Sequence, residues 1–146
     1  MKVMEGTPPK NNGYDNVALD IEVWGAYSEQ LHRPQRGGKF ACMSLCGDGK
    51  TVYIIKKQSD LQTALERVDK ACWAFHNAAF DWPWLKFLVG GDLPDRKPGY
   101  FWDTLIMERD LWGGYYDSFS LADLYRRYFS KILDKRQQKK FIEGTE

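Results

Sequence analysis

Two acidic residues of one short stretch have the spacing of a pair of metal ligands. Asp20 and Glu22 lie within residues 17–25, where Val, Leu and Ile alternate with other residue types. Successive side chains of a β-strand point to opposite faces, so both carboxylates share one face, with their Cα atoms roughly 6.6 Å apart. Like charges this close repel each other away from water, and a divalent cation with oxygen ligands relieves that repulsion. The other interpretation is a half-buried strand whose polar face meets water.

A third carboxylate is expected to approach this pair. Asp81 follows residues 72–75, a short apolar run that is typical of an interior strand, and it lies near the start of a predicted helix. Polar residues at a junction between a strand and a helix commonly lie in the crevice beside the strand ends. Asp81 is therefore predicted to lie near Asp20 and Glu22.

The order of the predicted elements favours an α/β fold. Three strands come first, and residues 47–50 join the second and third as an antiparallel hairpin. A helix with a Ser59–Gln62 capping box precedes the fourth strand, which is expected to run parallel to its neighbour. The predicted elements are strands at 17–24, 40–46, 51–56 and 72–75, and helices from Ser59, near Asp81, from Asp103, from Ser120 and over 134–142. A mixed sheet flanked by helices accommodates this order.

The composition is that of one folded domain. The 146 residues are 43% hydrophobic and 15% aromatic, which is enough for a core. Residues 1–15 lack periodicity and are expected to form a flexible or extended lead-in, which places a single domain at 16–146. The three cysteines cannot all pair and are interpreted as reduced core residues. With no apolar run of membrane-spanning length and no signal-peptide profile, the sequence predicts a soluble, cytoplasmic protein without a membrane partner.

The acids and their neighbours resemble a known superfamily. The pattern Asp20-x-Glu22, followed by Asn77-x-x-Phe80-Asp81, is similar to the first two motifs of the DEDD 3′–5′ exonucleases. The flanking residues look most like the proofreading domain of family A DNA polymerases, and RNase D-like enzymes are the next most similar group.

Two later segments extend the resemblance over residues 17–142. Residues 101–105 are similar to the Asp-Thr dipeptide that opens a helix in this superfamily, and residues 119–124 resemble its Ser-Leu-x-x-Leu helix. Apart from the resemblance, Asp103 has the position of a helix cap.

The resemblance implies an RNase H-like mixed sheet, antiparallel in its first three strands and then parallel. It also implies two-metal hydrolysis at the 3′ ends of single-stranded DNA, with Mg²⁺ or Mn²⁺ ions ~3.5–4 Å apart. In that scheme Asp20 bridges both ions, Glu22 holds the ion that generates hydroxide, and Asp81 supports the second. The implied partner is a DNA polymerase domain or subunit, and RNA is the alternative substrate.

Several nearby residues are candidates for contact with the substrate. Asn77 lies near the substrate in the superfamily, or else it satisfies backbone groups at the end of the strand. His76 and Phe80 belong to the same segment, although a hydrogen-bonded histidine and a core phenylalanine are the favoured interpretations. Trp24 and Tyr27 have the character needed to stack on a terminal base, and packing in the core or on the surface is the favoured alternative.

A basic run follows these motifs. Residues 126–140 contain seven cations and one acid. A solvated helix face is the usual explanation of such a run, and contact with the phosphates of nucleic acid is the alternative. The tentative backbone contacts are Arg126, Arg127 and Lys131.

Two departures separate the chain from the superfamily pattern. Val23 stands where a threonine is usual, and no Tyr-x-x-x-Asp or His-x-x-x-Asp motif supplies the fourth carboxylate. Asp123 belongs to an earlier helix, and Glu143 or Glu146 would stand on a poorly fixed chain end. We therefore expect a C-terminally incomplete domain that alone binds metal weakly or turns over slowly. The explanations are a truncated polymerase, a partner chain that supplies the last helix, or a degenerate exonuclease acting as a nucleic-acid-binding or structural module.

Overall fold

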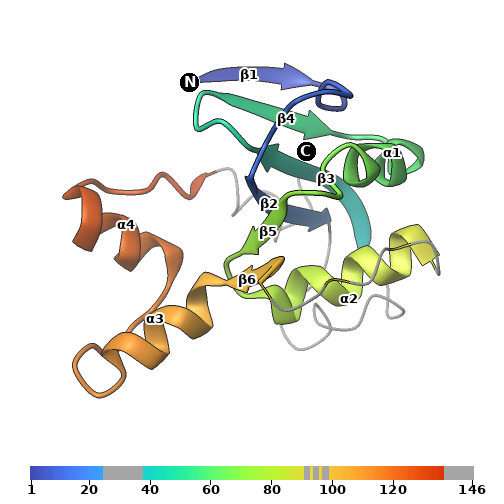
Figure 1. The fold of residues 1–146 in the computed structure, drawn as a ribbon. Coiled ribbons are helices and arrows are strands. Elements are labelled where there is room, and N and C mark those ends of the chain that lie inside the picture. Colours follow the sequence, from blue (N-terminus) through green and yellow to red (C-terminus); the bar gives the residue numbers. More distant parts are fainter. Residues whose placement is uncertain (25–37, 91–92, 94–95, 97–98, 137–146) are drawn as a thin grey trace.

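The computed structural model describes residues 1–24, 38–90, 93, 96 and 99–136 (Figure 1). In these residues the centre of the fold is a six-stranded sheet with the spatial order β1-β4-β3-β2-β5-β6. The strands are β1 (Lys2–Glu5), β2 (Asn16–Trp24), β3 (Lys39–Cys46), β4 (Thr51–Ile55), β5 (Cys72–Phe75) and β6 (Phe101–Asp103).

The helices divide into two groups. In Figure 1, α1 and α2 lie beside the sheet, whereas α3 and α4 project away from it beyond β6. None of the helices in the described part of the chain has the length and apolarity needed to span a membrane. The helices are the 3₁₀-helix η3 (Gln58–Asp60), α1 (Leu61–Glu66), α2 (Ala78–Val89), α3 (Thr104–Trp112) and α4 (Leu121–Phe129).

The alternating pattern of β2 has the predicted outcome. Its apolar positions are at most 4% exposed, whereas Asp20 is exposed and Glu22 is half-buried on the opposite face. Because side chains of a strand alternate between faces, burying the apolar set directs both acids to the other side of the sheet. The buried positions are Val17, Leu19, Ile21 and Val23.

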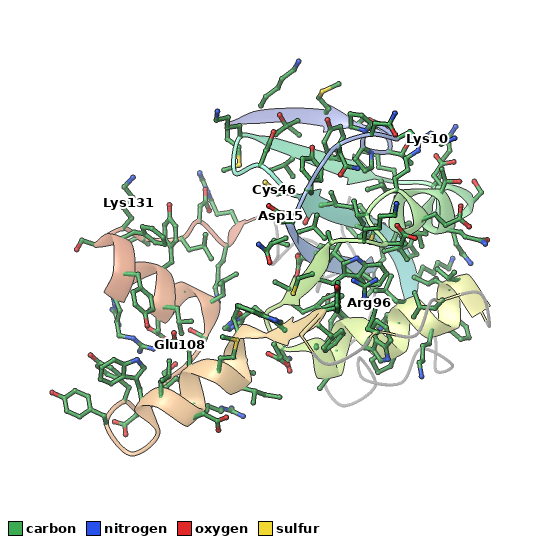
Figure 2. The ribbon with its side chains drawn as sticks, in the orientation of Figure 1. Lys10, Asp15, Cys46, Arg96, Glu108 and Lys131 are labelled. Atoms are coloured by element: carbon green, nitrogen blue, oxygen red, sulfur yellow. The ribbon has the colours of Figure 1, made fainter. Side chains whose placement is uncertain are left out.

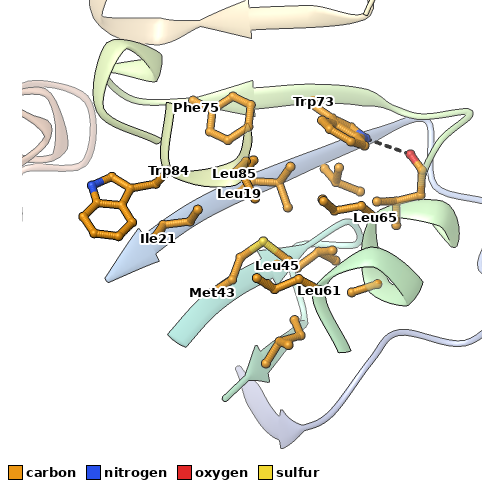
Figure 3. Close-up of a cluster of buried hydrophobic side chains, with 14 of the residues drawn as sticks. Leu19, Ile21, Met43, Leu45, Leu61, Leu65, Trp73, Phe75, Trp84 and Leu85 are labelled. Carbon is orange, nitrogen blue, oxygen red and sulfur yellow. Dashed lines mark hydrogen bonds between the residues drawn. The ribbon is translucent and has the colours of Figure 1, made fainter. Parts of the chain in front are cut away.

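The core holds this sheet against α1 and α2. Figure 3 shows side chains from β2 and β3 meeting those of both helices, with Trp73 of β5 beside them. The Trp73 indole Nε1 donates a 2.9 Å hydrogen bond to the Val68 carbonyl, so its polar atom is satisfied inside the core. Each large apolar side chain buried in this way contributes about 1.5–3 kcal/mol. The three cysteines are free, and Cys72 is buried.

The strand directions confirm the predicted α/β, RNase H-like mixed sheet. Strand β3 is antiparallel to both β2 and β4, whereas β5 runs parallel to β2. In the β3–β4 turn, Asp48 Oδ1 accepts hydrogen bonds of 2.8 Å and 2.7 Å from the backbone N–H groups of Lys50 and Thr51. This carboxylate fixes the hairpin that the glycine-rich residues 47–50 predicted.

Two strands were not predicted from sequence. Strand β1 runs parallel to β4, and the Lys2 N–H donates a 2.7 Å hydrogen bond to the Lys50 carbonyl. The sheet thus begins before the expected domain boundary at residue 16. All four residues of β1 are exposed, so it has no alternating pattern to reveal it. Strand β6 has three residues and pairs with β5, which is too short for a periodic signal.

One helix start differs from prediction, and another agrees with it. The Ser59–Gln62 capping box is wrong, because η3 occupies that region and α1 begins at Leu61 after an N-cap residue whose side chain makes no capping bond. Helix α2 begins at Ala78 and has Asp81 in its first turn, in agreement with the predicted position near the helix start. The predicted helix over 134–142 lies mostly outside the described residues.

Candidate active site

Asp81 contacts the backbone of β2 between the two other acids. Asp81 Oδ1 accepts a 2.9 Å hydrogen bond from the backbone N–H of Ile21, the residue between Asp20 and Glu22. This bond joins the first turn of α2 to β2 at the point where the other two carboxylates arise. Asp81 is only 2% exposed. The predicted approach of Asp81 to the pair on β2 is therefore present as a direct contact with the strand.

The protein around this site disfavours the charged form of each acid. Burial, together with a smaller effect from the negative charge of Asp20, raises the pKa of Glu22 to about 7. Burial raises the pKa of Asp81 to about 8, with smaller contributions from the charges of Asp20 and Glu22, while the Ile21 N–H acts in the opposite direction. Asp20 reaches solvent, yet the surrounding protein still removes enough water to raise its pKa. In the absence of a cation, Asp81 is therefore mostly protonated and Glu22 about half protonated at neutral pH, and a bound cation would favour their charged forms.

The donor atoms suit a hard divalent cation. None of the ion pairs found among the described residues compensates the three acids, and carboxylate oxygens are the ligands that Mg²⁺ prefers. Within the described residues, however, no three His, Cys, Asp or Glu side chains are already gathered as a metal centre. The residues fit such an ion by their chemistry, and their side chains would have to close around it.

Asp103 fixes the neighbouring helix starts. Its carboxylate accepts hydrogen bonds from the backbone N–H groups of Asn77 (3.1 Å) and Ala78 (2.8 Å) at the start of α2. It also accepts a 2.9 Å bond from the N–H of Leu105 in α3. The prediction that Asp103 is a helix cap is confirmed for α3. Its second role at α2 was missed, because it depends on the pairing of Phe75 with Asp103 across β5 and β6.

His76 is held by both ring nitrogens. Its Nδ1 lies 2.9 Å from Thr104 Oγ1, and its Nε2 lies 3.0 Å from the Phe119 carbonyl oxygen. A carbonyl oxygen only accepts, so Nε2 carries the hydrogen in this contact. The Thr104 hydroxyl also reaches the Phe75 carbonyl at 3.1 Å. These contacts give the packed, hydrogen-bonded histidine that was the favoured interpretation.

We expect His76 to titrate below the usual histidine value of 6.5. Burial lowers its pKa, although the Phe119 carbonyl and the charge of Asp103 partly oppose this. The folded state therefore takes up a proton less readily than the unfolded state, so this group destabilises the fold as the pH falls below 6.5. Proton NMR of the imidazole, assigned by loss of the signal in His76→Gln, measures the midpoint. A midpoint above 6.5 would show that the contacts stabilise the charged ring more than burial disfavours it.

An open cavity of about 780 Å³ extends from this site along α3 and the start of α4. Asp20, His76 and Asn77 line one part of it, and Arg109 and Lys135 line another. Asn77 has a positive φ of 76° and its side chain makes no capping bond. The crevice predicted beside the strand ends thus exists. The other lining residues are Leu105, Gly113, Asp117, Ser118, Phe119, Ser120 and Leu121.

The remaining candidates for substrate contact occupy different settings. Phe80 is partly buried and packs against the hydrophobic core. Trp24 is half-buried at the end of β2, where it pairs with Lys39 of β3. Tyr27 lies outside the described residues. Neither Phe80 nor Trp24 is among the described residues that line the cavity.

The three basic candidates lie on or just after α4. Arg126 forms a 3.0 Å ion pair with Asp123, and the Arg127 guanidinium lies 4.2 Å from the centre of the Tyr116 ring. Lys131 is exposed, and Figure 2 shows its side chain pointing away from the protein. Arg127 is thus engaged within the fold, while Lys131 is open to solvent.

Comparisons with known proteins identify the family and the fold of this chain. A family model described as 3′-5′ exonuclease matches residues 8–141. No curated protein sequence is significantly similar to this chain. Among solved structures, Brucella melitensis NrnC is similar with a TM-score of 0.70 and 18% identity, over 98% of this chain and 74% of NrnC. NrnC with bound Mg²⁺ (TM-score 0.68) and NrnC bound to pGG (0.70) match with the same identity and coverage.

Two RNase D structures are also similar. Escherichia coli RNase D, an exoribonuclease involved in structured RNA processing, has a TM-score of 0.65 and 19% identity over 98% of this chain and 37% of its own. The Trypanosoma brucei RNase D complex with RNA U12 has a TM-score of 0.61 and 18% identity, over 87% of this chain and 44% of its own. At these identities the likeness is one of fold.

Proposed function

Because this chain belongs to the 3′–5′ exonuclease family, of the DEDD type, we propose that it hydrolyses phosphodiester bonds at the 3′ ends of single-stranded nucleic acid with the help of Mg²⁺ or Mn²⁺. The observation that carries the proposal is the buried Asp81 carboxylate, which is bonded to β2 between Asp20 and Glu22. Three acids without a compensating cation among the described residues form a site suited to a divalent ion.

Each acid has a distinct part in this proposal. Asp81 is held by the Ile21 N–H, so its second oxygen is the one left for a metal ion. Asp20 lines the cavity and is the acid placed to meet both the ion and the substrate phosphate. Glu22 completes the set from the same face of β2. Bound Mg²⁺ or Mn²⁺ would activate water and neutralise charge on the phosphate.

Hydrolysis should depend on metal and rise with pH. Glu22 and Asp81, with pKa values of about 7 and 8, must lose their protons before they bind a cation. We expect the rate at limiting Mn²⁺ to increase between about pH 6 and pH 9 and then to level, and chelation to abolish it. Release of the 3′ nucleotide from a labelled single strand measures this. A rate that is flat over this range would contradict the assignment of these carboxylates.

Two variants separate the enzyme from an inert module of the same fold. Asp20→Ala should remove hydrolysis, whereas the matched variant Asp15→Ala, at an exposed acid just before β2, should retain it. If the unmodified chain is inactive, calorimetric titration with Mn²⁺ distinguishes an enzyme from an inert module. Saturable binding that is lost in Glu22→Ala supports a working metal site, and no binding at millimolar metal supports a binding or structural module.

DNA and RNA are the two candidate substrates, and they differ in the sugar. The sequence resemblance favours DNA ends and proofreading for a polymerase domain or subunit. The similarity to two RNase D structures, one of them holding RNA U12, favours an RNase D-like exoribonuclease as the second candidate. Matched DNA and RNA single strands of one sequence distinguish the two, because only the 2′-hydroxyl differs. Preference for DNA supports the proofreading role, and preference for RNA supports the RNase D-like role.

A further inference from the structure

The turn between α3 and α4 carries aromatic side chains that the active site does not use. Trp112, Tyr115 and Tyr116 are 41%, 76% and 37% exposed. Their rings form one group, which we name the turn cluster, with centroid distances of 6.0, 5.9 and 5.1 Å. Figure 1 shows this turn at the end of α3 remote from the sheet. The turn cluster therefore lies outside the hydrophobic core.

The rings of the turn cluster are fixed in orientation without a ligand. Their interplanar angles are 56°, 63° and 78°, so no pair is stacked face to face. The backbone N–H groups of Tyr115 and Tyr116 both donate to the Trp112 carbonyl, at 2.9 Å and 3.3 Å. Tyr115, the most exposed of the three, therefore presents a positioned ring to solvent.

A row of side chains joins the turn cluster to the cavity. Phe119 lines the same cavity as Asp20. The Arg127 guanidinium lies 5.6 Å from the Phe119 ring centre and 4.2 Å from that of Tyr116. Helix α3 has nine residues, so the turn cluster stands about 13 Å beyond the start of that helix. A strand with its 3′ end at the acids would reach the turn cluster only with its more distant nucleotides.

The charges along this path favour an anionic ligand. Arg109 and Lys135 line the cavity, where the acids are Asp20 of the active site and Asp117, and Lys131 is exposed nearby in sequence. No ion pair among the described residues involves these three cations. Asp123, by contrast, is engaged by Ser118, Ser120 and Arg126. The open cations could thus contact phosphates.

We propose that the turn cluster is a base-stacking site for single-stranded nucleic acid, engaging nucleotides upstream of the 3′ end. The proposal rests on the proposed function for the direction of the strand. Aromatic rings stack on bases of any sequence, and a positively charged groove follows the backbone. Such a site would increase the affinity for longer strands and leave a dinucleotide unaffected.

Binding without hydrolysis tests the site. Fluorescence anisotropy with a labelled thymidine oligonucleotide of about eight residues, in chelator, should show Tyr115→Ala binding about five- to 100-fold more weakly than the unmodified chain. Tyr115→Phe, which keeps the ring, should bind normally. The same should hold for Phe87→Ala, which removes a 51% exposed ring from α2 that does not line the cavity. Binding of a labelled dinucleotide should not change in Tyr115→Ala.

Three results would overturn the proposal. One is equal affinity for the longer oligonucleotide in the unmodified chain and Tyr115→Ala. Another is an equal loss for the oligonucleotide and the dinucleotide, which would indicate an effect through the fold. The third is a dimer in sedimentation that Tyr115→Ala dissociates without changing oligonucleotide affinity, which would make the turn cluster a protein interface. Because the binding measurements are made in chelator, they test base stacking independently of hydrolysis. A failure of the stacking proposal can therefore be distinguished from a failure of the proposed function.

Discussion

Asp81→Asn should abolish hydrolysis and at the same time stabilise the metal-free fold at alkaline pH. The asparagine Oδ1 can still accept the hydrogen bond from the Ile21 N–H, but the neutral amide is a poor ligand for the ion. Ligation to a catalytic metal supplies several kcal/mol of transition-state stabilisation, so the rate should fall by at least about 100-fold. Nucleotide release from a single strand at saturating Mn²⁺ measures this loss.

The stability effect follows from the raised pKa of Asp81. Its pKa is about 8 in the folded protein against 3.8 as the reference value, so the folded state holds this proton more tightly than the unfolded state. Stability contributed by this group is therefore highest below about pH 4 and declines as the pH rises to about 8. Thermal unfolding in chelator should show Asp81→Asn more stable than the unmodified chain at about pH 9, by roughly 1 kcal/mol or more, with little difference near pH 4.

The exposed Asp15 is the matched control for both measurements. Asp15→Asn removes one negative charge near β2 but should change neither the hydrolysis rate nor the pH dependence of stability. If Asp81→Asn unfolded at lower temperature than the unmodified chain at about pH 9, the buried carboxylate would have to be stabilised by its surroundings. That result would remove the electrostatic argument for a cation at this site.

Asp103→Ala should produce the largest loss of stability among the acidic residues outside the metal site. The Asp103 carboxylate accepts from four backbone N–H groups, two at the start of α2 and two at the start of α3. Removing an N-cap side chain costs about 0.5–2 kcal/mol for one helix, so losing caps on two helices should cost about 1–4 kcal/mol in the free energy of unfolding. Chemical denaturation measures this difference.

Two further variants show whether capping is the cause. Asp103→Asn keeps an oxygen at the Oδ1 position, which serves three of the four bonds, so its loss should be intermediate. Asp110→Ala removes an exposed acid from the same helix α3 and should change stability by no more than about 0.5 kcal/mol. Equal effects of Asp103→Ala and Asp110→Ala would show that the double cap adds little.

The parts of the fold that follow a local pattern could be predicted. The period of two along β2 placed Asp20 and Glu22 on one face, and the glycine-rich turn placed the β3–β4 hairpin. The parts that depend on pairing between distant segments could not. The bond from Ile21 to Asp81 joins residues 60 positions apart, so sequence gave only an expectation that they approach. The cap that Asp103 provides to α2 requires β6, whose three residues carry no periodic signal.

The exposure of side chains on α4 could not be predicted from the sequence either. The helical spacing of Leu121, Leu124 and Tyr128 is typical of a buried face, and Ser120 caps the helix as predicted. Yet only Leu124 is buried, while Leu121 and Tyr128 are 49% and 57% exposed. A periodic pattern shows which residues form the apolar face of a helix. It does not show whether other described parts of the chain pack against that face.

The pairing of β1 with β4 has a practical consequence for expression of this protein. A chain shortened to begin at residue 16, the boundary that composition suggests, would lose the strand that covers the outer edge of β4. The backbone N–H and C=O groups at that edge of β4 would then be unpaired and could form hydrogen bonds with strands of other molecules, which is a common origin of aggregation. Residues 2–5 thus protect the edge of β4. A tag or fusion partner at the amino terminus needs a spacer that lets β1 keep its pairing with β4.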